Sequence, residues 1–161
     1  LAGLAAARSE LVFFSDSDNQ FDYAGLTQLL PLAERYDVGC GYRKDRRDPL
    51  MRKLNAFGWS LTVRALFGYL VRDLNCAFKL FRRSALQCID VGSLQSRGAL
   101  VNTELLVRLK AANQSIVEVP VTHLPRVAGT ATGAKPRVIP RAFAEQFLCA
   151  VHCAHSPIHL V

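Results

Sequence analysis

The sequence changes abruptly from apolar to acidic between residues 11 and 20. Residues 11–14 read Leu-Val-Phe-Phe, and Ser15-Asp16-Ser17-Asp18-Asn19-Gln20 follows at once. A short run without polar residues is typical of a strand buried on both faces of a parallel sheet. Ligands of open α/β sheets bind beyond the carboxyl ends of such strands. The transition therefore predicts an α/β fold with polar site residues directly after residue 14.

The rest of the chain shows helical and strand patterns in turn, without a repeat or a linker that would mark a second domain. Asp22 is expected to cap a helix that Pro31 interrupts, and Pro120 favours an edge position for the last strand. Residues 125–140 are rich in Gly, Thr, Pro, Lys and Arg, which predicts a mobile basic loop. The other expected elements are a helix end at 1–8, helices at 22–35, 50–71, from Ser84, at 103–112 and at 142–153, and strands at 37–41, 77–81 and 115–119.

Charge and hydropathy narrow the class of protein. Half of the residues are hydrophobic, which excludes a disordered chain, and no run approaches the roughly 20 uncharged apolar residues of a membrane-spanning helix. The net charge of +7 favours acidic partners such as nucleotides, phosphorylated lipids or an anionic membrane surface. Nucleic acid is disfavoured because the aromatic residues lie in apolar runs and not among the basic ones.

The five cysteines have no regular spacing, and we interpret them as reduced thiols in a cytosolic setting. The chain begins without Met and without a signal peptide, which suggests a fragment. Near the C-terminus a zinc site is conceivable, but the spacing matches no compact finger, and we prefer a fraying terminal helix. The residues concerned are Cys149, His152, Cys153, His155 and His159.

Asp16 and Asp18 form the strongest candidate site. Two carboxylates two residues apart in a turn can converge on one hard cation, Mg²⁺ or Mn²⁺, which then neutralises a diphosphate. Spacing alone leaves solvated turn residues as an alternative, and the position after a buried strand favours the metal. Asp73 is a candidate base or orienting group for an acceptor, with a turn or cap residue as the alternative. Glu104 is interpreted as a first-turn helix carboxylate.

Basic residues gather in three clusters that suit phosphate oxygens, although each could equally be a solvated face. They are Arg43 to Arg47, Arg52 with Lys53, and Arg126 with Lys135, Arg137 and Arg141. The last cluster lies in the Gly- and Thr-rich loop, which could close over a diphosphate. The helix expected at 50–71 is too apolar for one buried face, so it either packs between layers, which we favour, or lies in a bilayer interface.

Several segments of the sequence, taken in chain order, match the motifs of a known protein family. They are residues 11–21, Gly39-Cys40-Gly41-Tyr42-Arg43 with Arg52, residues 73–83, Thr103-Glu104-Leu105-Leu106, Glu118-Val119-Pro120-Val121, and Pro125-Arg126 with Gly129-Thr130. Together they resemble the inverting glycosyltransferases of family 2. The most similar branch includes dolichyl-phosphate mannose synthase and bacterial undecaprenyl-phosphate sugar transferases.

The resemblance implies a partial GT-A (Rossmann-like) α/β fold lacking its first strands, with 1–161 as the C-terminal part of one catalytic domain. Asp16, Asp18 and Gln20 would hold the divalent metal, and Asp73 would orient the acceptor. Arg43, Arg52 and Arg126, with Lys135 in the same loop, would contact phosphates.

The implied reaction is metal-dependent, inverting transfer of a sugar from a nucleotide-diphosphate sugar to a polyprenyl phosphate. The enzyme would be cytoplasmic and peripheral at the membrane. The family's strands that bind the nucleotide base have no counterpart before Leu1, so we expect the 161 residues by themselves to be inactive. Two alternatives stay open: a saccharide acceptor, which needs Asp73 as a true base, and a non-catalytic basic remnant that binds membranes or polyanions.

Overall fold

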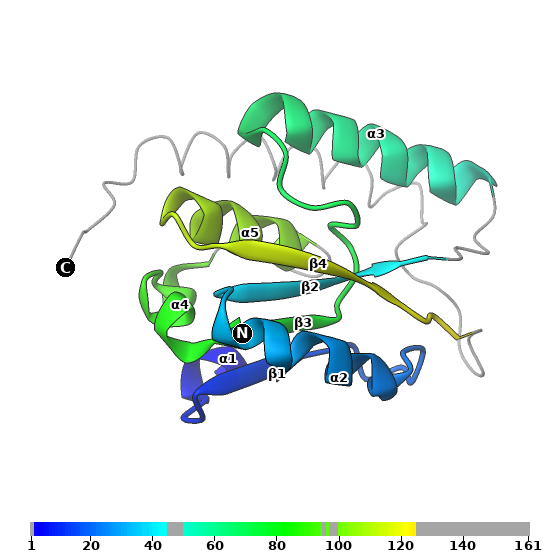
Figure 1. The fold of residues 1–161 in the computed structure, drawn as a ribbon. Helices are drawn as coiled ribbons and strands as arrows, with labels where there is room; N and C mark the ends of the chain where they lie inside the picture. The colour runs from blue at the N-terminus through cyan, green and yellow to red at the C-terminus, as the bar shows by residue number, and fades with distance from the viewer. Residues whose placement is uncertain (1, 45–49, 95, 97–99, 125–161) are drawn as a thin grey trace.

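The fold is built on a mixed four-stranded sheet. The computed structural model describes residues 2–44, 50–94, 96 and 100–124. Within them the strand order is β1-β3-β2-β4, and β3 runs antiparallel to both of its neighbours, whereas β2 and β4 are parallel (Figure 1). The carboxyl ends of β1, β2 and β4 therefore lie at the same edge, where β3 begins. The strands are β1 (Leu11–Phe14), β2 (Val38–Arg43), β3 (Lys79–Arg82) and β4 (Ile116–Val121).

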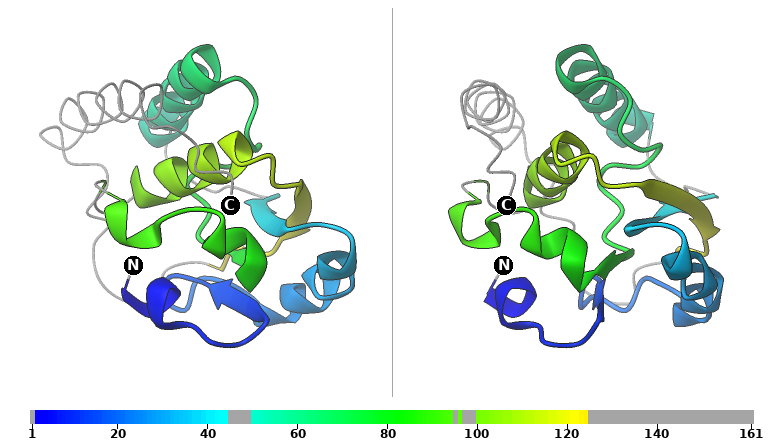
Figure 2. Two further views of the ribbon diagram at one scale, coloured as in Figure 1. Left: turned by 90° about the vertical axis from the view of Figure 1, so that its left-hand side faces the viewer. Right: turned by 60° about the vertical axis from the view of Figure 1, so that its left-hand side comes forward.

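Helices cover both faces of this sheet (Figures 1 and 2). The face that carries Val38 and Cys40 packs against α1, α3, α4 and α5, and the face that carries Val119 and Val121 packs against α2. Alternate residues of one strand thus enter different cores, as strand geometry requires. The helices are α1 (Ala2–Ala6), α2 (Leu26–Leu29), α3 (Leu50–Phe67), α4 (Arg83–Gln87) and α5 (Leu100–Ala111), with short 3₁₀ turns at Tyr23–Gly25, Pro31–Glu34 and Val91–Ser93.

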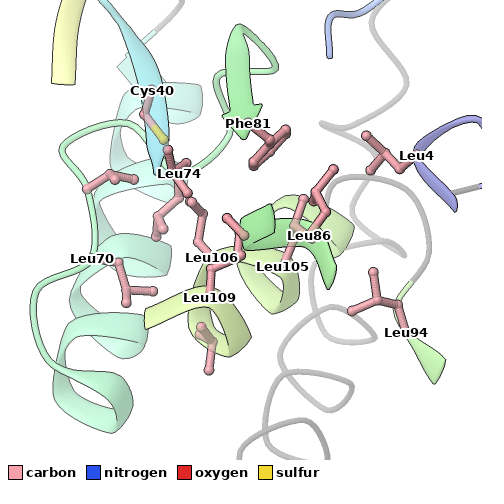
Figure 3. Packing of buried hydrophobic residues seen from close by; sticks show 14 of the residues in the cluster. Leu4, Cys40, Leu70, Leu74, Phe81, Leu86, Leu94, Leu105, Leu106 and Leu109 are labelled. Carbon is pink, nitrogen blue, oxygen red and sulfur yellow. The ribbon is translucent and has the colours of Figure 1, made fainter. Parts of the chain in front are cut away.

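The larger core lies between the sheet and α5. Figure 3 shows Phe81, Leu105 and Leu106 directed toward one another, with Leu70 and Leu74 arriving from the segment after α3. Each of these five side chains is at most 8% exposed. The core therefore fixes the segment that carries Asp73 against the sheet.

Local patterns predicted the strands well and some helix bounds poorly. The strand at 11–14 has the predicted bounds, but the expectation of a parallel strand buried on both faces was wrong. β1 runs antiparallel to β3, lies at one end of the described sheet and buries only Val12. β4 is an edge strand with Pro120 exposed, as predicted. The helix expected at 22–35 is three short pieces. Asp22 Oδ1 caps the first by accepting from the Ala24 amide at 2.9 Å, and Pro31, which has no amide hydrogen, begins the last.

Two further helix bounds were wrong. The helix expected to reach residue 71 ends at Phe67, because Gly68 adopts a left-handed conformation with φ of 74°. α5 begins at Leu100 and not at Thr103, so Glu104 lies inside the helix and not in its first turn. The loop expected at 125–140 and the helix at 142–153 lie outside the described residues.

α3 packs through one side only. Trp59 and Val63 are 8% and 1% exposed, whereas Leu54, Phe57 and Leu61 are 54%, 68% and 58% exposed. The favoured interpretation that this helix packs between two layers is therefore wrong for the side that carries Leu54, Phe57 and Leu61. In the described part of the chain, no helix combines the length and hydropathy needed to cross a bilayer.

Replacing Gly41 by alanine is expected to destabilise the sheet edge by about 1–3 kcal/mol, since overpacking a filled interior has that cost. A Cβ at Gly41 would lie 2.9 Å from Val121 Cγ1 and 3.0 Å from Phe78 Cβ. The measurement is urea unfolding followed by circular dichroism. Gly58→Ala is the matched control, because a Cβ there meets nothing within 4 Å inside α3. Equal stability of the Gly41 variant and the wild type would contradict the close approach.

Candidate functional site

Four segments meet where β1, β2 and β4 end and β3 begins. Phe21 forms a bridge with His123, and the Leu124 amide donates to the Gln20 carbonyl at 2.7 Å, which joins the loop after β1 to the segment after β4. The Gly41 amide donates to the Phe78 carbonyl at 2.7 Å, which joins β2 to the segment that enters β3. The acidic loop after β1, the end of β2 and the segment that enters β3 therefore lie at one edge of the sheet.

The acidic loop lies on the exposed side of this edge. Asp16 is exposed and Asp18 is half-buried, and Asp18 Oδ1 accepts from the Gln20 amide at 3.3 Å. Asn19, between Asp18 and Gln20, has a φ of 55°, in the left-handed region that Asn tolerates. The turn thus places both carboxylates on the same short loop.

Gln20 anchors this loop. Its side chain is 9% exposed, and Nε2 donates to the Leu124 carbonyl at 3.2 Å. The amide nitrogen is therefore engaged in holding the loop to the segment after β4. A metal-binding role for the Gln20 oxygen stays a prediction.

The donor set suits a hard cation that is shared with a ligand. Carboxylate oxygens are the ligands that Mg²⁺ and Mn²⁺ prefer. Among the described residues no group of three or more His, Cys, Asp and Glu side chains could hold a metal ion. Asp16 and Asp18 would therefore supply part of a coordination shell, and water and diphosphate oxygens would complete it.

Arg43 and Asp73, predicted as separate phosphate and acceptor residues, form one ion pair. Arg43 Nε donates to Asp73 Oδ2 at 2.7 Å and Nη2 donates to Oδ1 at 2.9 Å, while the Arg43 amide lies 3.4 Å from Oδ2. Their side chains are 13% and 8% exposed. Both oxygens of Asp73 are thus held by a planar cation, which suits an orienting role better than proton removal.

The turn after Asp73 is fixed from inside the protein. The Cys76 amide donates to the Asp73 carbonyl at 3.2 Å, and the Nζ of Lys79 donates to the Cys76 carbonyl. Lys79 is fully buried at the start of β3. Sequence reasoning missed Lys79, and the signal was a single lysine in the otherwise apolar strand expected at 77–81.

The described cysteines at this site are not thiolates. Burial raises the pKa of Cys40 to about 12 and that of Cys76 to about 11. Cys40, Cys76 and Cys88 are all free thiols. A thiolate is the form that attacks or ligates, so burial disfavours such chemistry at Cys40 and Cys76.

A cavity of about 640 Å³ opens beside Asp73. It lies between α3 and residues 68–75, the segment that connects α3 to the site, and mixes apolar and cationic side chains. Its lining includes Phe57, Leu61, Arg64, Tyr69, Arg72 and Asp73.

The remaining candidates are less well placed. Glu104 is 3% exposed and binds the Ser96 amide at 2.8 Å and Arg108 Nη2 at 2.6 Å, which makes it a buried structural carboxylate. Arg52 is on α3, but its side chain is outside the described part, as are residues Arg126 and Lys135 and the conceivable zinc ligands at 149–159.

Comparison with known protein structures bears on the fold. Glucosyl-3-phosphoglycerate synthase from Mycobacterium tuberculosis in complex with UDP superposes with a TM-score of 0.61 at 18% identity, over 92% of this chain and 52% of that one. The complex of the same synthase with Mn²⁺, UDP-glucose and phosphoglyceric acid gives a TM-score of 0.58 at 16% identity, with the same coverage. The predicted GT-A class of α/β fold is confirmed.

Sequence comparison identifies the family. The undecaprenyl-phosphate mannosyltransferase of Micrococcus luteus is 27% identical over 119 residues, which are 71% of this chain and 49% of that protein. The polyprenol monophosphomannose synthase of Mycolicibacterium smegmatis is 31% identical over 102 residues, 62% of this chain and 37% of that protein. The chain thus spans less than half the length of these relatives. The family model described as Glycosyl transferase family 2 matches residues 1–90, and the chain therefore belongs to glycosyltransferase family 2.

Proposed function

We propose that this chain forms the metal-binding and acceptor-binding part of an inverting transferase that moves a sugar from a nucleotide-diphosphate sugar to a polyprenyl phosphate. The observation that carries the proposal is that the Asp16 and Asp18 loop after β1 and the Arg43–Asp73 pair at the end of β2 lie at the same edge of the sheet, on either side of β3. The names of the two bacterial relatives support a polyprenyl phosphate acceptor.

On the donor side, Asp16 and Asp18 would hold the cation, with Gln20 as the further predicted ligand. A bound Mg²⁺ or Mn²⁺ stabilises the charge that develops on the departing nucleoside diphosphate. Arg43 contributes a fixed positive charge at the same edge, and Asp73 sets the orientation of its guanidinium group. Arg52, Arg126 and Lys135 are proposed as additional phosphate contacts.

On the acceptor side, a phosphate group is already ionised near neutral pH and needs no strong base. This suits Asp73, whose two oxygens are bound by Arg43. The neighbouring cavity has apolar walls at Phe57 and Leu61 and cations at Arg64 and Arg72. Such a lining fits an amphiphile with an isoprenoid chain and an anionic end.

The surface of α3 supports a peripheral membrane location. Leu54, Phe57 and Leu61 form an exposed apolar row, and residues 50–67 contain Arg52, Lys53 and Arg64 but no Asp or Glu. A basic helix with an exposed apolar row is suited to the interface of an anionic bilayer. A prenylated acceptor would be reached from that interface.

The test is transfer by the full-length protein from radiolabelled nucleotide sugars to undecaprenyl or dolichyl phosphate. We expect transfer in Mn²⁺ or Mg²⁺, its loss in EDTA, and a product whose anomeric configuration is opposite to that of the donor. A metal-independent reaction or a retained configuration would reject the proposal. If the protein transfers no sugar but binds anionic liposomes equally well with and without Mn²⁺ and nucleotide sugar, the non-catalytic remnant is favoured. The exposed apolar row on α3 supports that alternative.

Replacing Asp73 by asparagine distinguishes the two classes of acceptor. General base catalysis contributes about 10²–10⁴-fold, so a saccharide acceptor predicts a loss of that size. For a phosphate acceptor we expect a loss below that range, because no proton has to be removed and the Oδ1 of asparagine can still accept from Arg43 Nη2. The measurement is kcat with polyprenyl phosphate and with saccharide acceptors under saturating donor.

A further inference from the structure

Glu118 on β4 binds the segment that connects α3 to the site. Its Oε1 accepts from the Tyr69 hydroxyl at 2.7 Å, and its Oε2 accepts from the Arg72 amide at 2.6 Å. Both carboxylate oxygens are therefore used within four residues of the connector. The proposed function gives Glu118 no part.

The connector enters the core just before Asp73. It begins at Gly68, whose left-handed conformation ends α3, and Tyr69 is 50% exposed. Leu70 and Val71 enter the core, and the next side chain, Arg72, is exposed. The bond from the Arg72 amide to Glu118 thus holds the backbone immediately before Asp73.

The connector and β2 are matched residue by residue at this point. The Arg72 guanidinium lies 4.7 Å from the centre of the Tyr42 ring, and the following residues, Arg43 and Asp73, form the ion pair. Glu118 is opposite Cys40 in the parallel register of β2 and β4. The Arg72–Tyr42 and Asp73–Arg43 contacts join the connector to β2. Glu118 joins the same connector to the neighbouring strand β4.

The electrostatics agree with this arrangement. The hydrogen bond to Glu118 is the largest cause that raises the pKa of Tyr69, so the hydroxyl keeps its proton and donates at neutral pH. Arg64 of α3 lies 4.7 Å from the centre of the Tyr69 ring, and the Arg72 amide donates to Glu118. The Glu118 carboxylate is therefore bound by one donor on each of its oxygens.

We propose that Glu118 is a positioning residue of the transferase site: by holding the Arg72 amide to β4, it keeps the Asp73 carboxylate in bidentate contact with Arg43. The effect of Glu118 on turnover rests on the proposed function. The effect of Glu118 on the Arg43–Asp73 pair is independent of that function, because the pair is a property of the folded chain.

Nuclear magnetic resonance of the arginine Nε–H groups tests the structural part directly. The Arg43 signal is assigned by its absence in Arg43→Lys, and its exchange with water is then measured. In Glu118→Ala we expect exchange to rise about tenfold or more, because a hydrogen bond that opens more often exchanges faster. Glu118→Gln, which keeps an acceptor for the amide, should stay within about threefold of wild type.

Controls make the exchange result decisive. Glu34→Ala removes an exposed carboxylate elsewhere and should leave the Arg43 signal unchanged. Should Glu118→Ala fail to fold, Glu118→Asp keeps the charge but shortens the reach, and faster Arg43 exchange is expected there too. Unchanged exchange in a folded Ala or Asp variant overturns the proposal.

The full-length protein supplies the kinetic part. For Glu118→Ala we expect kcat to fall about 10–100-fold with the donor KM nearly unchanged, since a misplacement near 1 Å has that effect. Glu118→Gln should restore most of the rate. A general loss of structure would instead raise the donor KM and lower the melting temperature in both variants, and would overturn the positioning role. If the wild type transfers no sugar, the proposed function fails, while the exchange result still decides whether Glu118 holds the pair.

Discussion

Replacing Asp18 by asparagine is expected to lower metal-dependent sugar transfer by about 10²–10³-fold, because a cation that stabilises a departing diphosphate is worth several kcal/mol. Asparagine keeps an oxygen that can accept from the Gln20 amide, as Asp18 Oδ1 does at 3.3 Å. The loop is thus preserved while one negative charge is lost. The measurements are initial rates across an Mn²⁺ titration and calorimetry of nucleoside diphosphate binding with and without Mn²⁺.

The matched control is Asp22→Ser, which removes a carboxylate only four residues away. Asp22 caps the Tyr23–Gly25 turn through the Ala24 amide, and serine is an equally good cap. This variant should keep both its rate and its response to Mn²⁺. If Asp18→Asn kept the wild-type Mn²⁺ response, or if Asp22→Ser lost it, the acidic loop would not be the metal site.

Local features of this chain were predictable because neighbouring residues determine them. Residues 11–14 have no polar side chain, which correctly predicted a strand but not its burial, since only Val12 is buried. Asp16 and Asp18 follow this strand by chain connectivity alone. Pro120 lacks an amide hydrogen and correctly predicted an edge strand. That Arg43 and Asp73 lie at the same edge as this loop is a finding of the structure.

Contacts between distant segments were not predictable in the same way. Arg43 and Asp73 are 30 residues apart, with α3 between them, and no periodicity reports that their side chains meet. Glu118 was visible only as part of a strand motif, although it binds two residues of the connector. The direction of β3, antiparallel to its neighbours, is also a tertiary property. Sequence reasoning thus found the edge but not the network that orders it.

The second large effect is expected at the Arg43–Asp73 pair. Replacing Arg43 by methionine leaves Asp73, at 8% exposure, without its cation, and breaking a buried pair in this way costs about 3–5 kcal/mol. Arg43→Lys should recover only part of that loss, because an ammonium group lacks the planar fork that binds both Asp73 oxygens. The measurement is the free energy of unfolding from urea titrations.

The double variant Arg43→Met with Asp73→Leu separates stability from function. Removing both charges leaves no uncompensated group, so most of the lost stability should return, and the two substitutions should be coupled by about 2 kcal/mol or more. Sugar transfer should nevertheless stay at the level of the weaker single variant, because the site has lost its fixed cation. A double variant as unstable as the sum of the two singles would mean that the pair is not coupled in solution. A stable double variant with wild-type transfer would mean that the pair serves the fold and not the reaction.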